Sequence, residues 1–143
     1  MQKGTDFIGI GVVYFCHDGK GRVVMSKRGK NSRDEIGRWD IGGGGIEVHD
    51  TVENTIRKEI KEEYCTDALE IEYLGYRDVH RLHEGKKTHW IVLDFKVLID
   101  PKKVANAEPH KFNAVEFFQL DDLPSPLHSQ LPTFLEKYKK ELV

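Results

Sequence analysis

The sequence predicts a mixed α/β (α+β) fold, and two observations lead to that prediction. Runs rich in Val, Ile, Tyr and Phe at 7–16 and 90–98 are typical of strands. Apolar residues recur at helical spacing at 50–64 and at 132–142. Helices and strands therefore alternate along the chain, as they do when helices pack on the faces of a sheet.

Length and charge limit the classes of protein to which the chain can belong. At 143 residues it has the size of one domain, and we expect residues 1–143 to form one. Its 22 basic and 24 acidic side chains nearly cancel, which leaves no overall attraction to nucleic acid or to an anionic membrane. Two distant cysteines, Cys16 and Cys65, fit neither a disulfide framework nor a thiolate metal site. With no signal-peptide layout at 1–6, we expect a cytoplasmic protein without nucleic-acid or membrane partners.

The remaining strands are predicted from turn signals and composition. Asp18-Gly19 is a turn signal that joins strand 7–16 to strand 22–28 as a hairpin. Gly9 and Gly11 share one face of the first strand and leave a track without side chains, where another group can lie close. Further strands are expected at 68–80, 88–99 (buried, since it is apolar on both faces) and 114–120.

The helix at 50–64 is the clearest element, and it follows the strongest backbone punctuation in the chain, the four glycines at 42–45. Asp50 can cap the N-terminus of this helix while Glu53 reaches back, which is a capping-box arrangement. The apolar stripe of the helix consists of residues spaced four apart, Val52, Ile56 and Ile60.

Three glutamates of this helix, Glu59, Glu62 and Glu63, occupy one sector at about 100° per residue. An ordinary solvated face more often interleaves Glu with Lys at i, i+4, whereas here Glu59 faces Glu63. Two half-buried carboxylates ~6 Å apart repel by ~3 kcal/mol at an effective dielectric constant of 20, so they call for a cation. Oxygen ligands suit Mg²⁺ or Mn²⁺. A charged outer face is the alternative on spacing alone, but the glycine run favours a metal because its backbone can approach metal and phosphates.

These residues resemble the Nudix box, G-x5-E-x7-R-E-U-x-E-E-x-G-U. Gly44 is followed after five residues by Asp50, and after seven more by the run K-E-I-K-E-E-Y-C-T at 58–66. The run W-D-I-G-G at 39–43 is similar to the W-x-L-P-G-G that precedes the box. The resemblance covers nearly the whole chain and implies a Nudix-like α/β/α sandwich with a mixed β-sheet.

Three positions depart from the box: Asp50 stands where the family has Glu, Lys58 where it has Arg, and Cys65 where it has Gly. The resemblance implies that Asp50 and Lys58 form a supporting ion pair, which lacks the bidentate fork that Arg supplies. Cys65 in a left-handed C-cap would be strained. Because the three glutamates are intact, we expect catalytic competence with looser geometry.

The resemblance implies an enzyme that hydrolyses a nucleoside diphosphate linked to another group, with Mg²⁺ as cofactor and Mn²⁺ as a possible substitute. It implies that Glu59, Glu62 and Glu63 bind the metal together with the carbonyl of Gly43. One of these acids, or Glu108 from a later loop, would take the proton from the attacking water. An ordinary loop glutamate is the alternative for Glu108.

Substrate contacts are expected from Arg28, Arg38, Trp39 and Gly44. Segment 20–38 holds seven basic residues, for which phosphate contact is the functional interpretation and Arg28 the best candidate by position. For Lys20, Arg22 and Lys30 solvated loop charge is favoured. For Trp39 a core anchor is favoured over stacking on a base. A second metal site at His80 and His83 is disfavoured, because on a strand the two side chains point to opposite faces.

The compact length and the Glu108-Pro109 tail look closest to nucleoside-triphosphate pyrophosphohydrolases of the MutT type. We therefore expect a (deoxy)nucleoside triphosphate to be cleaved to monophosphate and pyrophosphate, by a monomer or a homodimer. ADP-ribose, nucleotide-sugar and coenzyme A diphosphatases are alternatives, the last because Arg28, Arg33 and Gly37 satisfy R-x4-R-x3-G. A non-catalytic nucleotide-binding Nudix module is the alternative from a different class.

Overall fold

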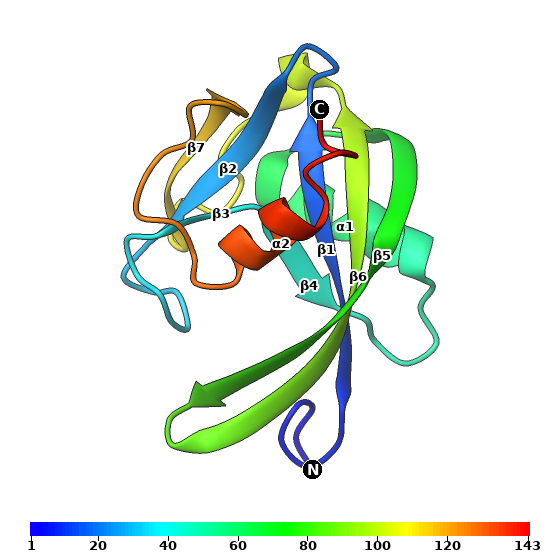
Figure 1. Ribbon diagram of the computed structural model, residues 1–143, viewed down its shortest axis with the longest axis vertical. Coiled ribbons are helices and arrows are strands. Elements are labelled where there is room, and N and C mark those ends of the chain that lie inside the picture. Colours follow the sequence, from blue (N-terminus) through cyan, green and yellow to red (C-terminus); the bar gives the residue numbers. More distant parts are fainter.

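The computed structural model describes residues 1–143 and places a seven-stranded mixed sheet between two helices (Figure 1). The mixed fold expected from the sequence is confirmed. A short 3₁₀ helix spans Pro101–Lys103, and no helix has the length and hydropathy that a membrane crossing requires. The remaining elements are β1 (Gly9–His17), β2 (Arg22–Arg28), β3 (Trp39–Asp40), β4 (Gly42–Gly45), α1 (Val52–Tyr64), β5 (Ala68–His83), β6 (Lys86–Ile99), β7 (Phe112–Gln119) and α2 (Leu131–Lys137).

Strand β1 organises the sheet, whose order is β3-β2-β1-β6-β5. It pairs in parallel with β6 along its whole length and meets β2 only at His17↔Val23. Because β2 then turns away to pair with β7, the edge of β1 is left free for β4, from Gly11↔Gly45 to Tyr14↔Gly42. The four glycines that the sequence marks as punctuation are therefore a strand, held by the ladder to β1.

The two faces of the sheet carry separate apolar cores, because strand side chains alternate between faces. Val12 and Tyr14 of β1 belong to the core under α1, which also contains the helix residues Ile56 and Ile60. Phe15 of β1 points the other way, into a core that α2 and the C-terminal residues complete. The helices thus cover opposite faces, as expected for an α/β/α sandwich (Figure 1).

Helix α1 begins two residues later than the sequence predicts, and the expected capping box is wrong. Thr51 is the N-cap, and its side chain accepts a hydrogen bond from the amide of Asn54 at 3.0 Å. Glu53 does not reach back but pairs with Arg57 at 3.0 Å. Since the hydroxyl of Thr51 performs the capping, the carboxylate of Asp50 is available for other partners.

Two other elements differ in length from their predicted bounds. The β5–β6 hairpin continues to His83↔Lys86, because Glu84 and Gly85 both adopt positive φ (51° and 78°), as a tight two-residue hairpin turn requires. This hairpin projects away from the body of the molecule (Figure 1). Helix α2 ends at Lys137 rather than 142, although Tyr138 and Leu142, which predicted the longer helix, are buried in the second core.

The glycine track on β1 holds the indole ring of Trp90. Gly9 and Trp90 are partners in the parallel ladder, and a Cβ on Gly9 would lie 2.6 Å from the ring. A Cβ on Gly45 of β4 would meet the same ring at 3.5 Å. The track predicted from the sequence therefore accommodates an aromatic side chain of the next strand.

Cys65 ends α1 in the left-handed region, with φ of 62° and ψ of 6°, while its amide donates to the carbonyl of Lys61 at 3.1 Å. This conformation costs a residue with a Cβ about 1–2 kcal/mol, and glycine avoids the cost. The strain expected at this departure from the box is present.

We predict that Cys65→Gly raises the free energy of unfolding by about 0.5–1 kcal/mol, since relief of the strain exceeds the extra entropy of the unfolded glycine. Urea unfolding at 25 °C measures the change. Cys65→Ser is the matched control, because it removes the thiol but keeps the Cβ, and it should leave stability nearly unchanged. An equal gain in both variants would assign the effect to the thiol instead of the backbone.

Candidate active site

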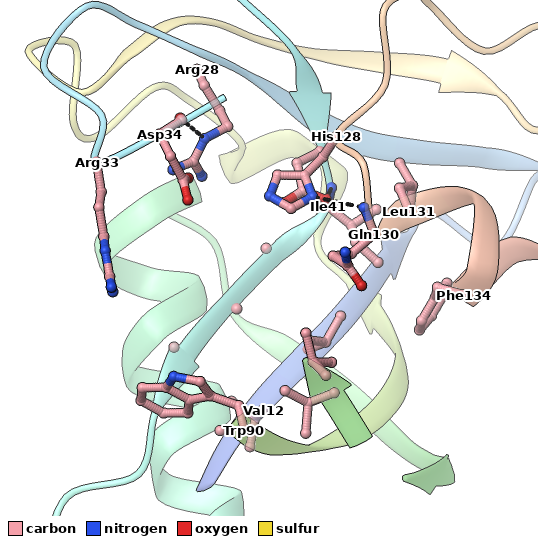
Figure 2. Close-up of a pocket in the computed structure, with 18 of the residues that line it drawn as sticks. Val12, Arg28, Arg33, Asp34, Ile41, Trp90, His128, Gln130, Leu131 and Phe134 are labelled. Atoms are coloured by element: carbon pink, nitrogen blue, oxygen red, sulfur yellow. Dashed lines mark hydrogen bonds and ion pairs between the residues drawn. The ribbon is translucent and has the colours of Figure 1, made fainter. Parts of the chain in front are cut away.

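A cavity of about 350 Å³ lies where β1 and β4 approach the hairpin, the loop after β2 and the start of α2 (Figure 2). One end is formed by Gly43 and Gly44 of β4 together with Glu63 of α1. Basic side chains, including Arg28 and Lys111, also line it. The cavity has the size of a small-molecule site and combines acidic, basic and apolar walls.

Glu63 is the buried carboxylate of this cavity, with only 5% of its surface exposed. It accepts a hydrogen bond from the hydroxyl of Tyr14 and another from the amide of Gly43. Loss of water around the carboxyl raises its pKa to about 8; the charge of Lys111 opposes the shift and that of Glu108 adds to it. At neutral pH this group therefore favours either a proton or a nearby cation.

Glu59 and Glu108 belong to the same acidic cluster as Glu63. Burial raises the pKa of the half-buried Glu59, and the charges of Glu62 and Glu108 raise it further. Glu108 comes from the loop before β7, and its negative charge raises the pKa of both Glu59 and Glu63. Glu62 is exposed beside them.

The glycines of β4 make room for these carboxylates. A Cβ on Gly44 would lie 2.7 Å from Cδ of Glu59, and one on Gly42 would lie 2.9 Å from Oε1 of Glu63. A side chain at either of these two positions would therefore push the acid beside it away from the sheet. Glycine is required here by close approach rather than by an unusual backbone conformation.

The family model of the NUDIX domain matches residues 8–138. The chain belongs to the NUDIX family. Its acid-rich helix and glycine strand are the Nudix box and the approach to it. Nudix hydrolases generally use divalent metals.

Among solved structures, the chain is similar to the MutT NUDIX hydrolase from Burkholderia pseudomallei, with a TM-score of 0.80 and 26% identity over 92% of this chain and 98% of that one. The MutT protein from Methanosarcina mazei Go1 superposes with a TM-score of 0.78, at 18% identity over 94% of each chain. The NUDIX domain of Shewanella oneidensis NrtR, solved with ADP ribose, gives 0.68 at 17% identity, over 95% of this chain and 89% of that one. The last two show the shared fold alone. No curated protein matches the sequence significantly. Family and relatives together make the chain a Nudix hydrolase.

The Nudix-box acids and the glycine before the box fit a hard divalent cation, because every donor is an oxygen: the carboxylates of Glu59, Glu62 and Glu63 and the carbonyl of Gly43. In this conformation no three of these carboxylates bring oxygens within 4.8 Å of one another, and Glu63 points toward Tyr14. Holding one ion between them therefore requires side-chain rotation.

The ion pair implied by the box is present. Nζ of Lys58 lies 3.4 Å from Oδ2 of Asp50, across the first two turns of α1. The side chain of Asn54 also donates to Asp50 at 2.7 Å and is the main reason that the pKa of this carboxyl is lowered. Asp50 thus ties the loop after β4 to the helix that carries the acids, with one contact to lysine in place of a bidentate pair.

The expected substrate contacts divide into two groups. Arg28 and Gly44 line the cavity, and the guanidinium of Arg28 is held 3.1 Å from the carboxylate of Asp34. Arg38 lies outside the wall and donates to the carbonyl of Leu127 at 2.9 Å. Trp39 is 8% exposed, in the second core, and so takes the position of a core anchor.

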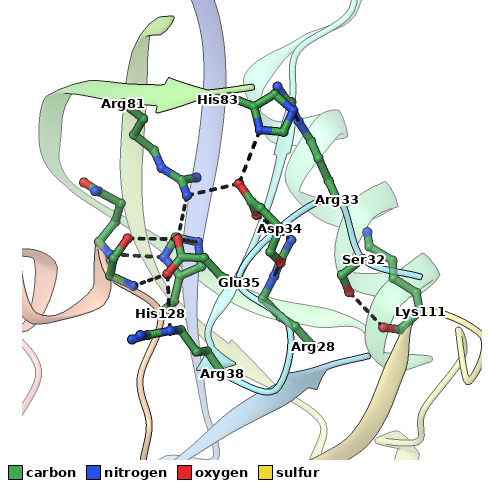
Figure 3. A network of polar contacts seen from close by, with 12 residues as sticks. Arg28, Ser32, Arg33, Asp34, Glu35, Arg38, Arg81, His83, Lys111 and His128 are labelled. Carbon is green, nitrogen blue, oxygen red and sulfur yellow. Dashed lines mark hydrogen bonds and ion pairs between the residues drawn. The ribbon is translucent and has the colours of Figure 1, made fainter. Parts of the chain in front are cut away.

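A polar network at the mouth of the cavity was missed by sequence reasoning (Figure 3). Its centre is Glu35, which accepts from Arg81 at 2.6 Å and from the hydroxyl of Ser129 at 2.8 Å. Arg81 also pairs with Asp34 at 3.0 Å, so the loop after β2, the end of β5 and the segment before α2 are joined. No motif signals this network, because its members are 46 and 94 residues apart along the chain.

His128 enters the same network as a neutral imidazole. The amide of Gln130 donates to its Nδ1 at 3.1 Å, which leaves the proton on Nε2 to be donated to Glu35 at 2.9 Å. Burial lowers the pKa of His128 despite the carboxylate beside it. Deeper in the wall, burial raises the pKa of Asp40 to about 7, against the charge of Arg28. The cavity therefore presents fixed cations beside a neutral imidazole and a carboxyl that is about half ionised at pH 7.

We predict that the burial of Glu63 makes the metal-free protein less stable as pH rises. Between about pH 4.5 and pH 8 the folded state keeps a proton on Glu63 that the unfolded state has lost, so the free energy of unfolding falls through this window. In Glu63→Gln the fall between pH 5 and pH 8 should be smaller, by on the order of a few kcal/mol. Urea unfolding in EDTA at both pH values measures it.

The control is Glu62→Gln, which removes an exposed acid of the same helix and should keep most of the pH dependence of the wild type, because the charge of Glu62 acts on the pKa of Glu59 and not on that of Glu63. The titration of Asp40 is common to all three proteins and cancels from the comparison. Parallel pH dependences for the wild type and Glu63→Gln would mean that Glu63 ionises normally in the folded protein.

Proposed function

We propose that this Nudix hydrolase is a Mg²⁺-dependent pyrophosphohydrolase that cleaves a (deoxy)nucleoside triphosphate to the monophosphate and pyrophosphate. The observation that carries the proposal is the acidic cluster beside the cavity, whose member Glu63 lines the cavity and is buried against the glycine strand. A cation relieves the repulsion within this cluster, and phosphates are the ligands that such a cation brings into an adjoining cavity.

Glu59, Glu62 and Glu63 would hold the ion from α1, joined by the carbonyl of Gly43 on β4. When bound, Mg²⁺ neutralises charge on the phosphate oxygens and lowers the pKa of bound water. Asp50 and Lys58 would not bind the ion themselves. Their ion pair anchors the first turns of the helix that carries the three acids, and so helps to position those acids.

Glu108 is our candidate for the group that takes the proton from the attacking water. It is close enough to raise the pKa of both Glu59 and Glu63, but it comes from a separate loop. Because Glu108 is not on the helix, it can approach the water while the glutamates of α1 stay bound to the ion. A general base must come within hydrogen-bond reach of that water, directly or through one further water.

The basic wall residues would orient the phosphates. Lys111 and Arg33 line the cavity and form no ion pair, so their charges are available to an anionic ligand, whereas Arg28 is already paired with Asp34. The cavity volume of about 350 Å³ is at the lower end of the range for small-molecule sites, which favours a compact nucleotide over coenzyme A. The likeness to a MutT NUDIX hydrolase at 26% identity also supports this substrate class.

The first test is Glu62→Gln. We expect it to lower kcat by at least about 100-fold with little change in unfolding free energy, because Glu62 is exposed and its proposed role is in metal binding alone. Pyrophosphate and phosphate release should be measured with Mg²⁺ over nucleoside triphosphates, ADP-ribose, NADH and coenzyme A. Glu53→Gln is the matched control, since Glu53 is an exposed acid of α1 that pairs with Arg57 away from the cluster.

Equal release by the wild type and Glu62→Gln would refute catalysis by these acids. Release from ADP-ribose but from no triphosphate would support the metal site and reject the substrate class. Nucleotide binding with no turnover of any compound would establish the non-catalytic module.

A further inference from the structure

We propose that the β5–β6 hairpin carries a second metal site, for a divalent transition ion of the zinc class, formed by Asp78, His80 and His89. The site is separate from the Nudix-box acids and does not depend on the proposed hydrolysis. It lies on the face of the hairpin that points away from the cavity.

Alternation along the two strands separates this site from the cavity. Side chains at alternate positions point to opposite faces of a strand. The hairpin residues that line the cavity are Arg77, Val79, Arg81, His83, Thr88, Trp90 and Val92. Asp78, His80 and His89 have the opposite parity, so they project together from the other face. His83 lines the cavity, so it lies on the face opposite to His80, as strand alternation predicts from the sequence. The partner of His80 is His89, on the neighbouring strand.

The three side chains are already gathered. His80 and His89 are direct partners in the antiparallel ladder, and their rings stack with centroids 4.2 Å apart. Nε2 of His89 lies 2.9 Å from Oδ1 of Asp78. One ligand atom from each of the three residues lies within 4.8 Å of the others.

Zinc coordination requires only small movements of the three side chains. Zn–N and Zn–O bonds of about 2.0–2.1 Å in a tetrahedron place ligand atoms roughly 3.3 Å apart. His89 and Asp78 are 34% and 49% exposed, so their side chains can rotate toward an ion, and water can complete the shell. Two imidazoles select zinc or its neighbours over Mg²⁺, which prefers oxygen ligands alone.

The backbone under the site is well held. The pairing of β5 with β6 shifts register twice, between Ala68 and Glu70 and between Tyr73 and Gly75. From Gly75 to the tip of the hairpin the register is uninterrupted. The amide of His89 also donates to the carbonyl of Gly4 at 2.7 Å. An ion that bridges His80 and His89 would therefore cross-link two strands that are already in register.

The structure holds a second group of three potential metal ligands, and comparison with it supports the hairpin site. Asp34, Glu35 and His128 also place ligand atoms within 4.8 Å of one another. There, however, Arg81 and Ser129 already satisfy Glu35, and Arg28 and Arg81 already pair with Asp34, so a metal would have to displace cations. On the hairpin face, the cation beside the proposed site is Lys87, which is exposed and forms no ion pair.

The experiment is an isothermal calorimetric titration in which Zn²⁺ is added to EDTA-stripped, dialysed protein in the presence of excess Mg²⁺. We expect one equivalent of Zn²⁺ to bind to the wild type, and His80→Ala and His89→Ala to weaken that binding at least tenfold. His110→Ala removes an exposed histidine elsewhere on the chain and should bind Zn²⁺ as the wild type does. Shifts of the His80 and His89 ring protons in NMR spectra, on the same addition of Zn²⁺, provide an independent readout.

The Glu62→Gln variant separates this site from the Nudix box. If the hairpin binds the ion, Glu62→Gln retains the full equivalent of Zn²⁺, whether or not the box is catalytic. No uptake by the wild type, or the same uptake by His80→Ala and His89→Ala, overturns the proposal. Uptake that is lost in Glu62→Gln but kept in His80→Ala assigns the zinc to the box and likewise overturns it.

Discussion

The burial of Glu63 against a side-chain-free strand is the constraint on which the rest of the site depends. A carboxylate with 5% of its surface exposed needs hydrogen-bond donors, and it has the hydroxyl of Tyr14 and the amide of Gly43. It also needs space, which exists only because β4 has no Cβ atoms near it. Strand β4 can pair with β1 because β2 leaves that edge after a single pair of residues. The burial of Glu63 therefore depends on the glycines of β4, and the position of β4 depends on the sheet topology.

Helix α1 presents the acids to this arrangement, and its ends show where the chain departs from its family. At the start, Asp50 and Lys58 keep the charges of the box pair but meet in a single contact of 3.4 Å. At the end, Cys65 occupies a left-handed position where the family has glycine. Neither departure moves Glu59 or Glu63 from the wall of β4. The chain therefore keeps its acids on a helix that has a single-contact ion pair at its start and a left-handed cysteine at its end.

Much of this was predictable from local patterns, and the failures have a common physical origin. Helical spacing located α1 and grouped the three box acids, and the pattern of the box brought Glu108 into consideration. The N-cap was misplaced by one residue because Asp50 and Thr51 are both good capping residues. In the structure Thr51 caps the helix, while Asp50 contacts Asn54 and Lys58. The network around Glu35 and the hairpin pair of His80 with His89 depend on contacts between distant segments, which no local pattern encodes.

The central claim is that the acid cluster around the buried Glu63 holds a divalent cation. Crystals soaked in Mn²⁺ and recorded at an energy where manganese scatters anomalously test it most directly. The account predicts an anomalous peak within about 2.5 Å of oxygens of Glu59, Glu62 and the carbonyl of Gly43, with Glu63 turned from Tyr14 toward the ion. A map without a peak at the cluster, in which Glu63 still accepts its hydrogen bond from Tyr14, would contradict it.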